Sequence, residues 1–181
     1  MLLPRTTPDE GALQDLAARY PDLEPDDLHV FLRLVYAGSR VFAAVESWMG
    51  RRGLSTARFV VLVNLNLDPD NGLTPSDLAD RVSASRATIT GLVDGLVRDK
   101  LVTREHCTED RRTVRVRLTE AGREMLSKVL PGHFRRVSAL VSRLSARDRR
   151  DLLRLSRRIG DAADALPDDW PADCGERVRA S

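Results

Sequence analysis

The 181-residue chain has few of the side chains that catalysis and metal binding depend on. Its two cysteines, Cys107 and Cys174, lie far apart and in no CxxC spacing, and its three histidines are scattered. Neither a disulfide framework nor a metal site is therefore indicated. We also recognise no acid/base pair, no nucleophile with a partner histidine and no phosphate-binding glycine loop. We expect a protein that is not an enzyme and uses no cofactor.

Long apolar runs are also missing. No stretch reaches the roughly 18 consecutive apolar residues of a membrane span. The amino-terminal MLLPRTTPDEGAL lacks the continuous apolar core of a secretory signal. We therefore expect a cytoplasmic protein with no membrane partner. With 42% hydrophobic residues, the chain is still able to bury a core.

The net charge is small, but its distribution is uneven. The 29 basic residues against 27 acids give +2, which by itself does not indicate a polyanionic partner. Residues 1–30 nevertheless hold seven acids and two arginines, whereas residues 133–158 hold nine arginines and two acids. We expect the arginine-rich segment either to flank DNA or to pair with the acidic end of a second copy. A solvated basic helix is the plainer interpretation.

Apolar residues at three- and four-residue steps predict long helices on both sides of the chain's centre. One covers about 27–49, and one runs from 119 through 130 until Pro131 and Gly132 interrupt it. The apolar stripe then resumes over 134–144, and a last helix carries the apolar residues of 152–166. After Ser55, the run VVLVNLNL alternates like a strand. Capping residues and the neighbouring helices favour a helix there instead.

The stretch LTPSDLADRVSASRATITGLVDGLVRDK predicts two helices joined by a short turn. Thr74 is a natural N-cap, Pro75 fits the first helical position, and Asp77 stands where a capping-box acid reaches back. Ser85 caps the second helix, which ends near Arg98. The two together form a helix-turn-helix unit.

Residues 101–107 and 113–118 read as two strands, with 108–112 as the hairpin tip. A helix-turn-helix followed by such a hairpin is a winged helix, which places a helix in the major groove of DNA and the hairpin beside or in the minor groove. The front of the second helix offers side chains and free amides to bases and phosphates. The residues expected to contact DNA there are Ser85, Arg86, Ala87, Thr88 and Thr90.

The hairpin tip joins acids to arginines. Asp110 can hold the guanidinium of Arg112 through a charge-assisted pair, which makes the arginine a rigid probe for a narrow, electronegative minor groove. We expect Arg111, Arg115 and Arg117 to face the flanking phosphates. The alternative is a solvated tip, whose ion pairs contribute at most ~1 kcal/mol.

Residues 54–126 resemble the MarR family of bacterial transcription regulators. The resemblance rests on LSTARFVVLVNL, on LTPSDLADRVSASRATITGLVDGLVRDKLVTRE, and on DRR leading to VRLTEAGREML. It implies that the family's wing arginine is Arg112, its bracing acid is Asp110 and its recognition helix is 85–98. It also implies a dimer in which both ends of the chain pair with a second copy.

One departure concerns the recognition helix. Gly91 stands where many members carry a basic or amide residue, and Gly95 follows one turn later. Each glycine costs roughly 0.5 to 1 kcal/mol against alanine, so we expect a helix that is soft or closely packed. A phosphate contact from position 91 is not expected.

The expected architecture is mainly α, with a winged helix-turn-helix domain and a two-stranded wing between amino- and carboxy-terminal dimerisation helices. Residues 1–53 would form the first helices, 54–122 the DNA-binding domain, 123–166 the last helices and 167–181 a flexible tail.

The implied function is that of a sequence-specific regulator: a homodimeric repressor on a near-palindromic operator in double-stranded DNA, relieved by a small aromatic or phenolic ligand. No residue can be assigned to that ligand. Two alternatives stay open, a redox-responsive regulator that uses Cys107 and a winged-helix protein-interaction module that binds no DNA.

Overall fold

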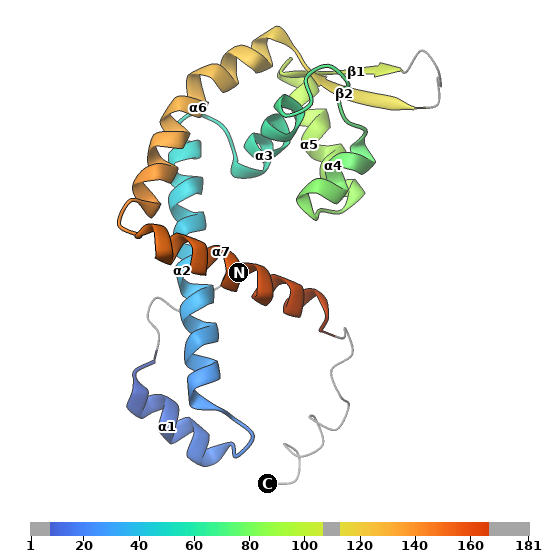
Figure 1. The fold of residues 1–181 in the computed structure, drawn as a ribbon. Coiled ribbons are helices and arrows are strands. Elements are labelled where there is room, and N and C mark those ends of the chain that lie inside the picture. Colours follow the sequence, from blue (N-terminus) through green and yellow to red (C-terminus); the bar gives the residue numbers. More distant parts are fainter. Residues whose placement is uncertain (1–7, 107–112, 167–181) are drawn as a thin grey trace. The chain divides into compact units, whose positions relative to one another are not determined.

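The computed structural model describes residues 8–106 and 113–166, which fall into two compact units divided between Val129 and Leu130. The fold is mainly helical with one two-stranded antiparallel sheet, as predicted (Figure 1). Its elements are α1 (Glu10–Arg19), α2 (Pro25–Gly50), α3 (Thr56–Asn66), α4 (Pro75–Val82), α5 (Arg86–Arg98), β1 (Val102–His106), β2 (Val114–Leu118), α6 (Glu120–Val141) and α7 (Ala146–Asp164).

The winged-helix lobe, residues 54–129, holds most of the buried side chains. In α3 the Ser55 hydroxyl accepts a hydrogen bond from the Arg58 amide at 3.2 Å, so the N-cap predicted for this segment is present. The VVLVNLNL run is helical through Asn66 rather than a strand, and α3 contacts α2, α4, α5 and β2. The buried residues of α3 are Phe59, Val61, Leu62 and Leu65.

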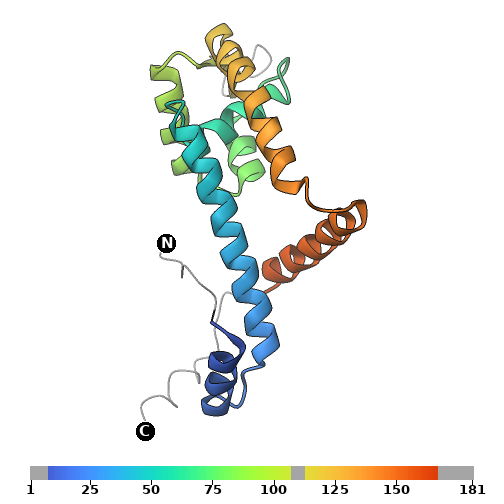
Figure 2. The ribbon, with the colours of Figure 1, turned by 90° about the vertical axis from the view of Figure 1, so that its left-hand side faces the viewer.

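Helix α2 begins at Pro25, two residues before the predicted start, because proline fits the first turn of a helix. Helix α1 lies beside its beginning, with Leu13 buried between them (Figures 1 and 2). At its other end α2 buries Trp48 and Met49. Between these ends it exposes a set of large apolar side chains: Val30, Phe31, Leu34, Val41 and Phe42.

By length and average hydropathy alone, α2 is the one helix in the described part of the chain that could cross a membrane. Arg33 and Arg40 interrupt its apolar sequence. A helix that packs against another protein surface meets the same criterion.

The predicted interruption at Pro131 is wrong, since α6 continues through this proline to Val141. The reason is that the helical apolar period is unbroken: Leu126 and Leu130 before the proline are followed by Phe134 and Val137, at steps of four, four and three residues. A proline costs an interior helix ~3 kcal/mol, which a continuous apolar stripe is able to offset once it is covered.

At its start, α6 is locked to the residues that precede β1. The Thr119 hydroxyl accepts from the Gly122 amide at 3.1 Å and donates to the Lys100 carbonyl at 2.7 Å, so the predicted cap is present. A Cβ on Gly122 would lie 2.1 Å from the Leu101 carbonyl oxygen. Only glycine permits this close approach.

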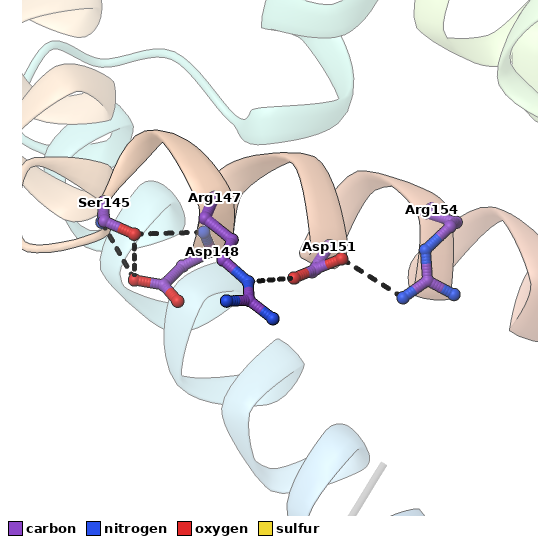
Figure 3. Close-up of polar contacts among 5 residues, drawn as sticks. All are labelled: Ser145, Arg147, Asp148, Asp151 and Arg154. Carbon is purple, nitrogen blue, oxygen red and sulfur yellow. Dashed lines mark hydrogen bonds and ion pairs between the residues drawn. The ribbon is translucent and has the colours of Figure 1, made fainter.

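Helix α7 carries a capping box in which Ser145 and Asp148 bond each other's backbone amides at 3.2 and 3.0 Å (Figure 3). Further along, the Asp151 carboxylate lies between Arg147, at 3.8 Å, and Arg154, at 3.2 Å. Part of the predicted positive charge is therefore neutralised within the helix itself. The helix buries no residue, and its exposed apolar side chains are Leu152, Leu153, Leu155 and Ile159.

Candidate nucleic-acid interface

The helix-turn-helix is built by three local signals. Thr74 and Asp77 form the predicted capping box, each side chain bonding the other's backbone amide at 3.1 Å. These bonds hold the pKa of Asp77 below its ordinary value, the Thr74 amide contributing most. Ser83 ends α4 in the left-handed conformation, with φ of 50°, and Ser85 then caps α5 by accepting from the Thr88 amide at 3.1 Å.

Helix α5 is amphipathic in the sense that the sequence predicts. Ile89, Val93 and Leu96 are fully buried against the rest of the lobe. The predicted contact residues Ser85, Arg86, Ala87, Thr88 and Thr90 are all exposed together at the front of the helix.

The three hydroxyl groups at this front already have intramolecular partners. Those of Ser85 and Thr88 lie 2.8 Å apart, and that of Thr90 donates to the Arg86 carbonyl at 2.9 Å. Each still has lone pairs that could accept a bond from DNA.

The two glycines of α5 are not explained by close packing. A Cβ added to Gly91 or Gly95 would meet nothing within 4 Å in the described structure. Close packing is therefore not the reason for these glycines, and the remaining expectation is that they lower the stability of α5.

Strands β1 and β2 pair from Val102 opposite Leu118 to His106 opposite Val114, and they extend away from α3, α4 and α5 (Figure 1). The predicted tip residues Asp110, Arg111 and Arg112, and also Cys107, lie outside the described residues. Their assigned roles stay predictions.

Arg115 and Arg117 have partners that the sequence did not indicate. The Arg115 guanidinium donates to the Gly72 carbonyl at 3.1 Å. Arg117 donates to the Asp70 carbonyl and pairs with Glu105 at 3.0 Å. Both arginines therefore brace the turn between α3 and α4 against β2. A phosphate contact from either would have to share a guanidinium that is already in use.

A second ion pair joins β1 to α5. Arg104 of β1 lies 2.6 Å from the Asp94 carboxylate of α5. Sequence reasoning missed this pair, because residues in a helix and in a following strand share no periodicity that would place them together. Residue type gave a weak signal: Asp94 is the sole acid among residues 85–98.

One cavity lies where the end of α2, the start of β1 and the first turns of α6 meet. It measures about 440 Å³, and its lining includes the apolar Leu101, Met125 and Val129 and the basic Arg52 and Lys128. Glu124 is also part of the lining and bonds Lys128 at 2.6 Å, which lowers the pKa of Glu124. The net charge of the lining is therefore +1. In the part of the chain that the structure describes, no three metal-ligating side chains cluster.

Comparisons with known proteins agree with this geometry. The model of the MarR family matches residues 52–113. The transcriptional repressor YetL of Bacillus subtilis is 35% identical over 150 residues, which cover 83% of this chain and 88% of YetL.

Two solved structures are also similar. Sco3205, a MarR family regulator from Streptomyces coelicolor in complex with DNA, has a TM-score of 0.72 at 25% identity and covers 83% of this chain and 94% of its own. The second is BpsR of Bordetella bronchiseptica, a protein whose binding to DNA is regulated by 6-hydroxynicotinic acid. It has a TM-score of 0.63 at 26% identity and covers 71% of this chain and 90% of its own.

Proposed function

The chain belongs to the MarR family of winged helix-turn-helix transcription regulators, and we propose that it is a cytoplasmic homodimeric repressor that leaves DNA when a small organic anion binds. Its relatives are DNA-binding regulators rather than enzymes. The proposal adds the homodimer, the near-palindromic operator and the effector.

The observation that carries DNA binding is the exposed front of α5 beside a projecting two-stranded wing. Arg86 can make a bidentate contact to guanine, and the free amides of the first turn can donate hydrogen bonds to a phosphate. The tip residues Asp110, Arg111 and Arg112 would add a minor-groove contact.

The homodimer is supported by the apolar side chains that α2, α6 and α7 expose. Contiguous apolar faces of this kind mark protein interfaces. A two-fold dimer would read two half-sites about 10 base pairs apart, so the operator would be near-palindromic.

The effector is supported by the cavity at the start of β1. A mainly apolar lining with a net positive charge suits a small carboxylate or phenolate with a hydrophobic ring. The nicotinic acid derivative that regulates BpsR belongs to the same chemical class.

The decisive experiment selects binding sequences from random duplexes and then measures affinity against salt. Arg86→Ala should relax the selected sequence, whereas Arg112→Ala should lower the slope of log affinity against log salt by about 0.9. If Arg86→Ala lost the same affinity for random and for selected DNA, Arg86 would not contact bases. A chain that binds no duplex at low salt would leave the protein-interaction module as the better account.

The redox alternative has its own test. If Cys107 were the sensor, peroxide would release DNA from the wild type and not from Cys107→Ser. We expect the two proteins to respond alike, because the effector acts without thiol chemistry.

A further inference from the structure

The recognition helix carries an acid in a position that a DNA-binding surface does not favour. Asp94 follows Thr90 by four residues, so the two side chains lie on the same face of α5, one turn apart. The Asp94 side chain is 48% exposed, whereas Val93 beside it is fully buried. A carboxylate on this face would repel the phosphates of an approaching duplex.

Arg104 is placed to cancel that charge. In the hairpin register it stands opposite Val116, which is fully buried, and directly opposed residues share one face of a sheet. Arg104 therefore belongs to the side of the hairpin that faces the helices, where its guanidinium lies 2.6 Å from Asp94. Glu105 and Arg117, on the other side, form a separate pair.

From this geometry we propose that Arg104 is a positioning residue for DNA binding: it neutralises Asp94, so that the face of α5 can approach a duplex, and ties the base of the wing to that helix. The inference rests on the proposed function, because it needs α5 to be the helix that meets DNA. It differs from a direct role, in which Arg104 would itself contact a phosphate.

A double-mutant cycle separates the two roles. Arg104→Ala leaves Asp94 unpaired at the interface, and we expect it to weaken binding of a selected duplex by about tenfold at low salt. Arg104→Ala with Asp94→Ala removes the repelling charge as well, so most of the lost affinity should return. Asp94→Asn with Arg104→Gln removes both charges but keeps a polar side chain at each position, and it should behave like the double alanine variant.

Melting temperatures, measured on all variants, show whether folding is intact. A double variant that binds as weakly as Arg104→Ala would overturn the proposal, because Arg104 would then act directly on DNA. Wild-type affinity in Arg104→Ala would overturn it too. If the wild-type protein binds no duplex, the proposed function itself is wrong. If the wild type binds but the double variants show no rescue, only the role of Arg104 is wrong.

Discussion

The winged-helix lobe and the helices that flank it treat their apolar side chains in opposite ways. Among the described residues, nearly all of the buried core belongs to residues 54–129, and every exposed large hydrophobic side chain except Leu67 lies outside that range. Helix α7 buries nothing, although its sequence is strongly amphipathic. The lobe can therefore fold on its own contacts, whereas the flanking helices need a second surface to cover them.

The largest effect on stability is expected when a core side chain is removed from the lobe. Leu62 is fully buried in α3, so Leu62→Ala should lower the free energy of unfolding by about 2 to 5 kcal/mol, as measured by urea denaturation. Leu67→Ala is the matched control, because Leu67 follows the same helix and is 72% exposed. Its effect should stay within about 0.5 kcal/mol. Equal losses would mean that burial does not separate the two positions.

The flanking helices are tested by placing a charge on an exposed apolar position. Phe42 of α2 is 56% exposed, and Phe42→Asp should weaken association of two chains by on the order of 2 kcal/mol, or about 30-fold, if a second copy covers it. Analytical ultracentrifugation over a range of concentrations measures this. Arg40→Gln, on an exposed position of the same helix two residues from Phe42 and so on another face, should leave the association unchanged. Identical sedimentation of wild type and Phe42→Asp would show that this face is not the interface.

The lobe and the flanking helices each contain one capping box, so the effect of losing the same kind of cap can be measured in both regions. Thr74→Ala should cost the lobe about 1 kcal/mol in global unfolding, since α4 is part of its cooperative core. Ser145→Ala removes the equivalent cap from α7, which has no buried residue. Its effect should appear as faster hydrogen exchange at the start of α7, with the melting of the lobe unaltered. Global destabilisation by both variants would mean that α7 and the lobe unfold together.

The Asp77 carboxylate adds a pH dependence to the lobe. Its pKa is lowered in the folded protein, first by the Thr74 amide, so this bond stabilises the fold above the ordinary pKa of 3.8 and is lost as pH falls through the lowered value. Asp77→Asn should therefore melt below the wild type at pH 7, and the difference should vanish in acid below the lowered pKa. If the difference in melting temperature persisted in acid, the stabilisation by Asp77 would not depend on its negative charge.

The smallest expected effect concerns the softness of α5. Because a Cβ at Gly95 meets nothing within 4 Å, Gly95→Ala should raise the free energy of unfolding by roughly 0.5 to 1 kcal/mol. Gly122→Ala is the opposing control, since its Cβ would strike the Leu101 carbonyl, and it should destabilise the fold. A destabilising Gly95→Ala would point to a tight contact at that position.

Local signals predicted the parts of this protein that local physics determines. The caps at Ser55, Thr74 and Ser85 each depend on residues three positions apart, and all three are present. The conflict over α3 was resolved correctly because neighbouring helices outweigh strand propensity.

The error at Pro131 and the omissions have different causes. The helix does not stop at Pro131, because an apolar stripe in the local sequence continues past it. Arg115 and Arg117 bond backbone carbonyls more than 40 positions away, so no pattern in the sequence could supply these two partners. The domain boundaries at 53/54 and 122/123 and the DNA contacts remain predictions.

Gly122 has a mechanical consequence. With no side chain between them, the first turn of α6 rests directly on the peptide group of Leu101, and the Thr119 amide bonds the same carbonyl at 3.1 Å. No flexible side chain lies between the two segments, so a tilt of that turn would also displace the start of β1. The position of the start of β1 is therefore coupled to the orientation of the first turn of α6.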